Sequence, residues 1–238
     1  MSPLGAIVLA GGSGTRLGGV RKPELRVGGV RLLDRVLSAL VAADPVVVVG
    51  PEDLAVPDGV RLTRETPPGG GPVAAIAAAF HTAAFDIGVF AEAGRVAGAG
   101  RIGHDGAARV AILGGDLPAL RPADVDMLSA AVDGRAHVDG DIHVDSREDV
   151  DGGAHVDGAI YVDDDGRRQW LCGVWRADAL MTRLHEFGTP AGGSLRALFG
   201  PLRVAEVRWR PGADETLPPY FDCDTEEDLR RAEEWWAR

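Results

Sequence analysis

A short apolar segment near the N-terminus runs directly into glycines, and this junction restricts the possible folds strongly. Residues 5–10 carry no polar side chain, and Gly11 and Gly12 follow at once. A continuous apolar run of this length is typical of a strand buried on both faces of a parallel sheet. Glycine allows positive φ angles and close approach of the backbone, so such a loop can offer several main-chain N–H groups to one anion. The junction predicts an α/β protein with an anion-binding loop.

The rest of the chain alternates strand-like and helical segments. Strands are expected at Val46–Val49 and Val110–Leu113, and near residues 158–162, 169–175 and 202–209. Helical spacing predicts helices over about 31–43, 71–84 and 122–133, and a last helix capped by Thr225 with Leu229, Ala232 and Trp236 as its buried stripe. This alternation predicts a three-layer, Rossmann-like α/β fold, in which a mainly parallel twisted sheet is covered by helices on both faces.

The chain is expected to form a single domain over residues 1–238, with loop insertions at 93–108 and 134–158. The tripeptide x-Val-Asp recurs every six residues in and after the second insertion, in five copies from His137-Val138-Asp139 to Tyr161-Val162-Asp163. A His/Asp metal-binding tract, a hexapeptide β-helix and a solvated loop expansion are three interpretations. We favour the loop, because nothing in the sequence makes the side chains converge on one ion.

Composition and charge exclude several classes of function. The net charge is −11, but the segment from Asp133 to Asp165 holds 11 acidic residues against two arginines, and residues 1–35 are locally basic. We therefore expect no nucleic-acid partner, whereas the basic loop can concentrate a small anionic ligand. No apolar stretch approaches the ~18 residues that span a bilayer and no secretory leader pattern is evident, so we expect no membrane partner and a cytoplasmic location. Cys172 and Cys223 lack metal-like spacing and are expected to be buried thiols.

One lysine occurs among 25 basic residues, and it is Lys22, at the end of the glycine-rich loop. A lysine ammonium is a compact point charge, whereas arginine is a planar fork, so the two are not interchangeable at a tight site. The loop is not a dinucleotide fingerprint, because Leu17 stands where a glycine is required, and it is not a Walker loop, because Pro23 follows Lys22. The pattern indicates a nucleotide-binding loop of another kind.

Residues 9–25 resemble the signature loop of MobA-like nucleotidyltransferases, Leu-Ala-Gly-Gly-x-x-x-Arg-x-Gly-Gly-x-x-Lys. Three further segments resemble motifs of that family in the expected order. Residues 70–74 resemble the Gly-Pro-x-Ala segment that contacts base and ribose, residues 115–118 resemble the strand-end aspartate that binds Mg²⁺, and residues 221–229 resemble the closing motif at the last helix. The resemblance covers nearly the whole chain apart from the two insertions, and it implies the nucleotidyltransferase form of the three-layer fold.

The resemblance also implies a set of site residues and Mg²⁺ as the cofactor. Arg16, Lys22 and Asp116 would be catalytic, and Asp116 and Asp224 would hold the metal. The nucleotide-binding residues would be Leu9, Ala10, Gly11, Gly12, Ser13, Gly14, Thr15, Arg16, Lys22, Gly71, Pro72 and Asp116. On the residues alone, Asp222 and Asp224 fit helix capping as well as metal binding, and Asp116 could be a buried structural carboxylate.

The activity implied is that of a molybdenum cofactor guanylyltransferase, which transfers GMP from GTP to the terminal phosphate of molybdopterin and releases pyrophosphate. The choice of guanine rests on Gly11, because the related cytidylyltransferases resemble Leu-Ala-Ala-Gly there. Guanylyltransferases of the family often end with Asn-x-Asn-Thr, whereas this chain has Asp222-Cys223-Asp224-Thr225. A molybdopterin cytidylyltransferase, a sugar-1-phosphate nucleotidyltransferase and a non-catalytic cofactor-delivery protein stay open. The implied partners are GTP, a molybdopterin-type substrate, and transiently molybdenum-insertion proteins or chaperones of the target molybdoenzyme.

Overall fold

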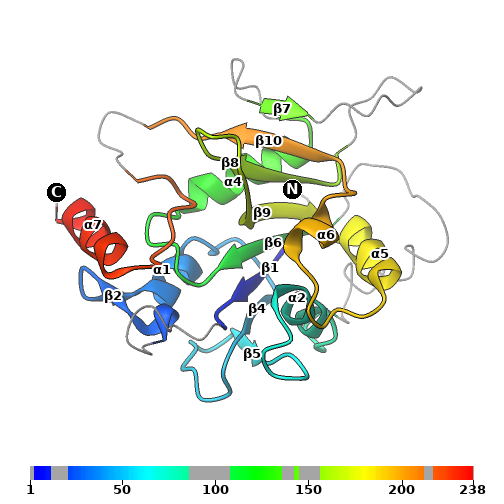
Figure 1. The fold of residues 1–238 in the computed structure, drawn as a ribbon, viewed down its shortest axis with the longest axis horizontal. Helices are drawn as coiled ribbons and strands as arrows, with labels where there is room; N and C mark the ends of the chain where they lie inside the picture. The colour runs from blue at the N-terminus through cyan, green and yellow to red at the C-terminus, as the bar shows by residue number, and fades with distance from the viewer. Residues whose placement is uncertain are drawn as a thin grey trace.

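The computed structural model describes residues 3–11, 21–85, 108–135, 142–144, 156–211 and 217–237. Within these residues, an eight-stranded sheet in the order β5-β4-β1-β6-β9-β8-β10-β7 forms the centre of the molecule (Figure 1). Strands β5, β4, β1 and β6 are parallel neighbours, β8 is parallel to β10, and the pairs β6–β9, β8–β9 and β10–β7 are antiparallel. The strands span Leu4–Leu9 (β1), Val46–Val49 (β4), Arg61–Thr63 (β5), Arg109–Gly114 (β6), Ile142–Val144 (β7), Gly158–Val162 (β8), Arg168–Arg176 (β9) and Val204–Arg208 (β10).

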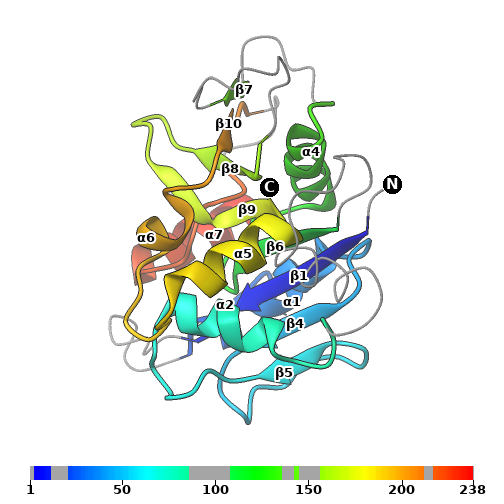
Figure 2. The same ribbon diagram turned by 90° about the vertical axis from the view of Figure 1, so that its right-hand side faces the viewer.

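Helices cover both faces of this sheet (Figure 2). One face packs against α1 (Leu32–Ser38) and α4 (Pro122–Val132), and the other against α2 (Pro72–Phe80), α5 (Ala177–Phe187) and α6 (Leu195–Phe199). In β1, Ala6 and Val8 join the first cluster and Ile7 the second, as the alternation of side chains along a strand requires. The three-layer α/β fold with a mainly parallel sheet is confirmed.

A smaller cluster flanks the sheet beside α1. It joins the hairpin of β2 (Arg26–Val27) and β3 (Val30–Arg31) to the final helix α7 (Glu226–Trp236), and the short 3-10 helix η2 (Lys22–Glu24) precedes the hairpin. Buried Val27 and Leu32 pack there with Ala232 of α7. The N-terminal and C-terminal parts of the chain are thereby in contact.

The carboxyl ends of three parallel strands meet at one edge of the sheet. Leu9 at the end of β1 is in register with Val49 of β4 and with Gly114 of β6. Strand β9 runs in the opposite direction, so its first residues lie at the same edge, where Cys172 pairs with Leu113. Ligands of open α/β sheets bind at the carboxyl edge, so the functional site is expected at this edge of the sheet.

A buried aromatic stack fixes the middle of the sheet. The ring of Trp175 on β9 is fully buried and lies 4.0 Å from the ring of Phe199, nearly parallel to it. A β-carbon at Gly158 of β8 would lie 2.2 Å from the Trp175 ring. Because the stack leaves the indole no room to move, we expect Gly158→Ala to destabilise the fold by about 1–3 kcal/mol. Thermal unfolding checks this, and an unchanged midpoint would contradict the packing described here.

The final helix begins as predicted but buries a different aromatic side chain. Thr225 Oγ1 accepts the N–H of Asp228 at 3.1 Å, and the Asp228 carboxylate accepts the N–H of Thr225 at 2.9 Å. Ala232 is buried as predicted, whereas the prediction for Trp236 is wrong, since 49% of it is exposed and Trp235 packs on the cluster instead. Trp236 ends the helix beyond that cluster, where its ring lies 3.7 Å from the guanidinium carbon of Arg35.

Part of the x-Val-Asp repeat belongs to the sheet. The segment Ile142–Val144 forms β7 at the sheet edge, and the last copy supplies the end of β8 and the turn that begins at Asp163. The copies at residues 137–139 and 149–151, and residues 93–107 of the first predicted insertion, lie outside the described residues, whereas Val156 and Asp157 of the fourth copy directly precede β8. In the part of the chain that is described, no group of three or more metal-binding side chains occurs, and no helix is long and apolar enough to cross a membrane. Cys172 and Cys223 are buried free thiols, as predicted.

Candidate active site

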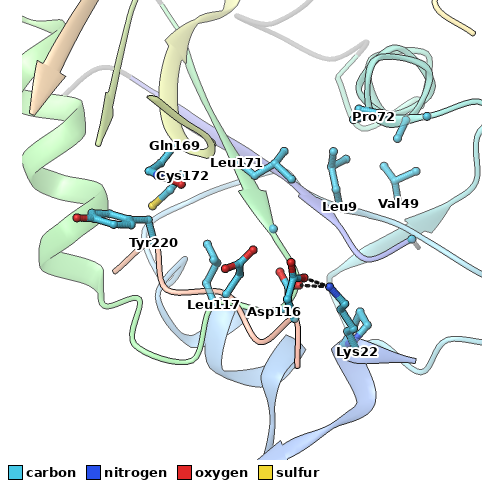
Figure 3. Close-up of a pocket in the computed structure, with 18 of the residues that line it drawn as sticks. Leu9, Lys22, Val49, Pro72, Asp116, Leu117, Gln169, Leu171, Cys172 and Tyr220 are labelled. Carbon is cyan, nitrogen blue, oxygen red and sulfur yellow. Dashed lines mark hydrogen bonds and ion pairs between the residues drawn. The ribbon is translucent and has the colours of Figure 1, made fainter. Parts of the chain in front are cut away.

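A pocket of about 730 Å³ opens at the carboxyl edge of the sheet (Figure 3). Its walls come from the ends of β1, β4 and β6, from the start of α2, from the first residues of β9, and from the segment before α7. The walls therefore combine the first and last parts of the chain. A concave site at this position is the expected location of ligand binding in an α/β protein.

Asp116 lies in the middle of the pocket, just beyond the end of β6. Its side chain is 21% exposed, and this loss of hydration raises its pKa to about 6. The positive charge of Lys22 opposes the rise, while the negative charges of Asp222 and Asp224 add to it. The Asp116 carbonyl also accepts the N–H of Cys223 at 3.3 Å, which brings the segment before α7 to the site.

Lys22 links two carboxylates from distant parts of the chain. Its Nζ lies 3.7 Å from Asp116 Oδ2 and donates a hydrogen bond to Asp224 Oδ1 (Figure 3). Burial opposes the charge of the ammonium, but the hydrogen bond to Asp224 and the charge of Asp116 prevail and raise the pKa of Lys22. The pocket thus holds a fixed positive charge between two negative ones.

The pocket has two ends, one on each side of Asp116. Leu9, Val49 and Pro72 lie on one side, which we call the α2 end, and Gln169, Cys172 and Tyr220 lie on the other, which we call the β9 end (Figure 3). The α2 end includes Glu65, whose carboxylate accepts the N–H of Gly69 at 2.9 Å. It also includes Gly71, whose φ of +90° favours glycine directly before α2. This shape can hold two molecules whose reacting groups meet at Asp116.

Comparison with known protein families identifies the chain. Residues 6–205 match the MobA-like NTP transferase domain. The chain belongs to this family. It is therefore a nucleotidyltransferase, an enzyme that acts on a nucleoside triphosphate and a small-molecule substrate. A comparison with curated protein sequences finds no match.

Solved structures share the fold of this MobA-like enzyme. Molybdopterin-guanine dinucleotide biosynthesis protein A from Archaeoglobus fulgidus is 20% identical with a TM-score of 0.61, and the match covers 98% of each chain. A 2-C-methyl-D-erythritol 4-phosphate cytidylyltransferase from Thermus thermophilus is 16% identical with a TM-score of 0.53 over 100% of each chain. A Mycobacterium tuberculosis protein in complex with manganese is 16% identical with a TM-score of 0.56 over 98% of this chain and 99% of that one. At these identities the likeness shows the fold alone.

Most of the site residues predicted for the MobA-like enzyme lie together. The pocket is lined by Leu9, Gly11, Lys22, Gly71, Pro72, Asp116 and Asp224. Ala10 is 4% exposed and lies behind the wall, where its N–H donates to the Val49 carbonyl at 2.8 Å. Residues 12–16, which include Arg16, lie outside the described residues. The binding role of each of these residues stays a prediction.

Several pocket residues were missed by the sequence analysis. Glu65, Gln169, Leu171 and Tyr220 line the pocket, although none of them was predicted as a site residue. Glu65 lies two residues after β5, a parallel strand whose carboxyl end points to the same edge, and that position was the available signal. Gln169 is the second residue of β9, and only the antiparallel direction of that strand, which the sequence does not reveal, brings it to this edge.

Asp116 and Asp224 are the side chains with which the pocket of the MobA-like enzyme could hold a divalent cation. Mg²⁺ is usually held by one or two carboxylates, with water and substrate phosphates as its other ligands. The gap between these two carboxylates already accommodates the Lys22 ammonium, so the surroundings favour positive charge there. The donor set therefore fits Mg²⁺, with the remaining ligands supplied by the substrates.

Proposed function

We propose that this enzyme transfers GMP from GTP to the terminal phosphate of molybdopterin and releases pyrophosphate. The arrangement of the pocket carries the proposal, because two ends flank the charged centre of Asp116 and Lys22. GTP would place its nucleoside at the α2 end, and the acceptor would occupy the β9 end. Fixing two reactants with their reacting atoms in line removes much of the entropic barrier to such a transfer.

In this reaction an oxygen of the acceptor phosphate attacks the α-phosphorus of GTP, and the bond from that phosphorus to the oxygen bridging the β-phosphate breaks. The protein has to orient the reactants and balance their charges. Asp116 and Asp224 would hold Mg²⁺, which when bound supplies positive charge to phosphate oxygens. Lys22 and Arg16 would stabilise the departing pyrophosphate, and the main-chain N–H groups that begin at Gly11 would bind the phosphates.

Glu65 supports the choice of guanine. Guanine presents two adjacent donors, N1–H and its amino group, which match the two oxygens of one carboxylate. Cytosine presents its amino group next to acceptors, so a carboxylate can accept only one hydrogen bond from that edge. The Gly69 N–H already holds one oxygen of Glu65 at 2.9 Å and restricts the orientation of its carboxylate within the α2 end.

We expect Glu65→Gln to lower kcat/KM for GTP by roughly tenfold to a hundredfold, because the amide keeps the size of the side chain but loses the second acceptor and the charge. Steady-state kinetics with GTP and with CTP measure the change in preference. Glu52→Gln is the matched control, since Glu52 is exposed and does not line the pocket. A GTP-to-CTP ratio that is unaltered in Glu65→Gln would remove Glu65 from base selection.

The test of the overall proposal is a mass-spectrometric analysis of products from molybdopterin, Mg²⁺ and each of the four NTPs. We expect a dinucleotide adduct and pyrophosphate with GTP. A product with CTP instead would favour a molybdopterin cytidylyltransferase, the second candidate, whose chemistry the cytidylyltransferase from Thermus thermophilus makes relevant. Turnover with a sugar 1-phosphate would favour the sugar nucleotidyltransferase, and absence of pyrophosphate release with every NTP would contradict catalysis altogether.

We also propose that residues 1–238 act as one domain, in the cytoplasm, and hand the product to molybdenum-insertion proteins or to chaperones of the target molybdoenzyme. The ion pair between Lys22 and Asp224 supports the single unit, because its two residues are 202 positions apart. Removing either end of the chain would remove one partner of that pair.

A further inference from the structure

The β9 end of the pocket differs chemically from the centre. It is lined by Gln169, Leu171, Cys172 and Tyr220. Asp222, two residues after Tyr220, also lines the pocket and lies close enough to Asp224 for their charges to interact. Among the described residues that line the pocket, Lys22 is the one cation, and Asp116 and Asp224 already engage it. The described part of the β9 end thus offers apolar surface and hydrogen-bonding groups without positive charge.

Gln169 presents a hydrogen-bond acceptor at this end. Its Nε2 donates to Asp163 Oδ2 at 3.1 Å and to the Arg167 carbonyl at 3.3 Å. An ionised carboxylate only accepts hydrogen bonds, so Asp163 requires the amino group of Gln169 to face it. The group of the amide that is left for a ligand is the carbonyl oxygen.

Asp163 is itself fixed by the turn between β8 and β9. Its Oδ1 accepts the N–H of Asp165 at 3.1 Å and that of Arg167 at 2.8 Å. Asp163 belongs to the last copy of the x-Val-Asp repeat, for which the reaction at Asp116 gives no role. Through Gln169 it acts on the pocket as a positioning residue.

Tyr220 adds a flat aromatic surface. Its half-buried ring lies 5.8 Å from the ring of Tyr161, and the buried Tyr161 hydroxyl donates to Asp124 Oδ1 at 3.4 Å. Burial and the negative charges of Asp164 and Asp163 raise the pKa of Tyr220 to about 12, so its hydroxyl stays protonated. The ring is therefore a neutral surface supported by a second ring behind it.

A phosphate group does not fit these surroundings, because it would meet the carbonyl of Gln169 and the negative charge of Asp222. A planar ring with several N–H groups fits them well, since its face can pack on Tyr220 while its edge donates to Gln169 and Asp222. The phosphate of such an acceptor would then lie toward Asp116, where the positive charge is.

We infer that the β9 end binds the ring of the acceptor as a reduced pterin, with Tyr220 against its face and Gln169 accepting from its edge. The inference rests on the proposed function, because it assigns the ring of the molecule whose phosphate is to react at Asp116. Gln169 and Tyr220 are then specificity residues for the acceptor, distinct from the residues that bind GTP.

The test is fluorescence titration of the metal-free and nucleotide-free protein with 7,8-dihydroneopterin, a reduced pterin without phosphate. We expect Tyr220→Ala to weaken binding by at least ~10-fold, the typical loss of one ring stack, and Tyr220→Phe to bind nearly as the parent protein does. Gln169→Leu should weaken binding too. Asp163→Asn should act in the same direction, because an amide at 163 would turn the Gln169 amino group toward the ligand.

Calorimetric titration with GTP separates this inference from the proposed function. Tyr220→Ala and Gln169→Leu should keep the GTP affinity. In turnover assays, both variants should raise KM for molybdopterin and leave KM for GTP unchanged. A general structural defect would instead impair the binding of both substrates. Glu65→Gln, at the α2 end, should keep the dihydroneopterin affinity. The inference is overturned if the parent protein does not bind dihydroneopterin at millimolar concentration, if Tyr220→Ala and Gln169→Leu bind it equally well, or if these variants instead lose binding of glucose 1-phosphate. Loss of GTP transfer with intact pterin binding would overturn the proposed function alone.

Discussion

Asp116→Asn should lower nucleotidyl transfer by at least ~100-fold while making the metal-free protein more stable at about pH 8. The first effect follows because asparagine keeps the shape but removes the charge that would hold the metal at the reacting phosphates, and a single electrostatic contact of this kind is worth about two to three orders of magnitude. Steady-state kinetics under saturating GTP and Mg²⁺ measure it.

The stability effect has the opposite sign because the carboxylate is only 21% exposed and its pKa is raised to about 6. In the unfolded chain the same group titrates near its ordinary value of 3.8, so above about pH 6 folding has to place a charge where it is poorly hydrated. A rise of about two pKa units on folding corresponds to a loss of roughly 3 kcal/mol in the free energy of unfolding when the group is charged. Asparagine avoids this cost, which should raise the unfolding midpoint by several degrees, since each kcal/mol is worth about 2–4 °C at this size.

The pH dependence of this stability difference shows whether the charge of Asp116 causes it. The advantage of Asp116→Asn should shrink as pH falls below about 6 and vanish only well below the ordinary pKa of 3.8, where Asp116 is protonated in both the folded and the unfolded chain. Asp58→Asn is the control, because Asp58 is exposed on a turn and its removal should change little at any pH. An advantage that does not vary with pH, or a less stable variant at pH 8, would contradict the burial described for Asp116.

The parts of the fold that sequence reasoning predicted are those in which local pattern and burial agree. Three of the four valines of β4 and the whole apolar run of β6 are buried, so the composition of these two strands alone identified them. Helix α5 was not predicted, although its apolar residues recur at helical spacing and pack on one core cluster, namely Ala177, Leu180, Met181, Leu184 and Phe187. The sequence therefore held a local signal for this helix that the prediction did not use. Strand β7 exists through antiparallel pairing with β10 across more than 60 residues, and no local signal encodes such pairing.

The residues of the candidate site also fall into two groups, those that sequence reasoning predicted and those that only the structure shows. Asp116 directly follows a buried strand, so the rule that strand ends meet at one edge was enough to place it. Gly71 and Pro72, at the start of α2, were predicted from the family resemblance, and they line the same pocket. The contact of Lys22 with Asp224 depends on α7 packing beside the β2–β3 hairpin, a tertiary arrangement without a sequence signature. Tyr220 and Gln169 reach the pocket through a turn and an antiparallel strand, so only the structure could show them.

Lys22→Arg should lower kcat by at least ~10-fold, about 1.4 kcal/mol of barrier, with the fold intact. The ammonium lies between Asp116 and Asp224 and is only 25% exposed. The longer, planar guanidinium of arginine tends to donate two parallel hydrogen bonds to a single carboxylate. The other carboxylate of the pair would then lose its contact with a positive charge. Arg21→Lys is the matched control on the neighbouring residue, because Arg21 pairs with exposed Asp53 at the surface and should tolerate the exchange.

A second variant, Lys22→Met, determines which task of the lysine matters, since methionine keeps the bulk of the side chain but not the charge. If Lys22 serves only to keep the two carboxylates together before substrates arrive, a large excess of Mg²⁺ should replace it and restore most of the activity. If the ammonium stabilises the departing pyrophosphate, Mg²⁺ cannot restore the rate, because the charge is missing at a different oxygen. We expect the second result, together with nearly unchanged KM for GTP, since a contact that strengthens in the transition state lowers kcat rather than ground-state binding. Unchanged kinetics in both variants would leave Lys22 without any role in the reaction.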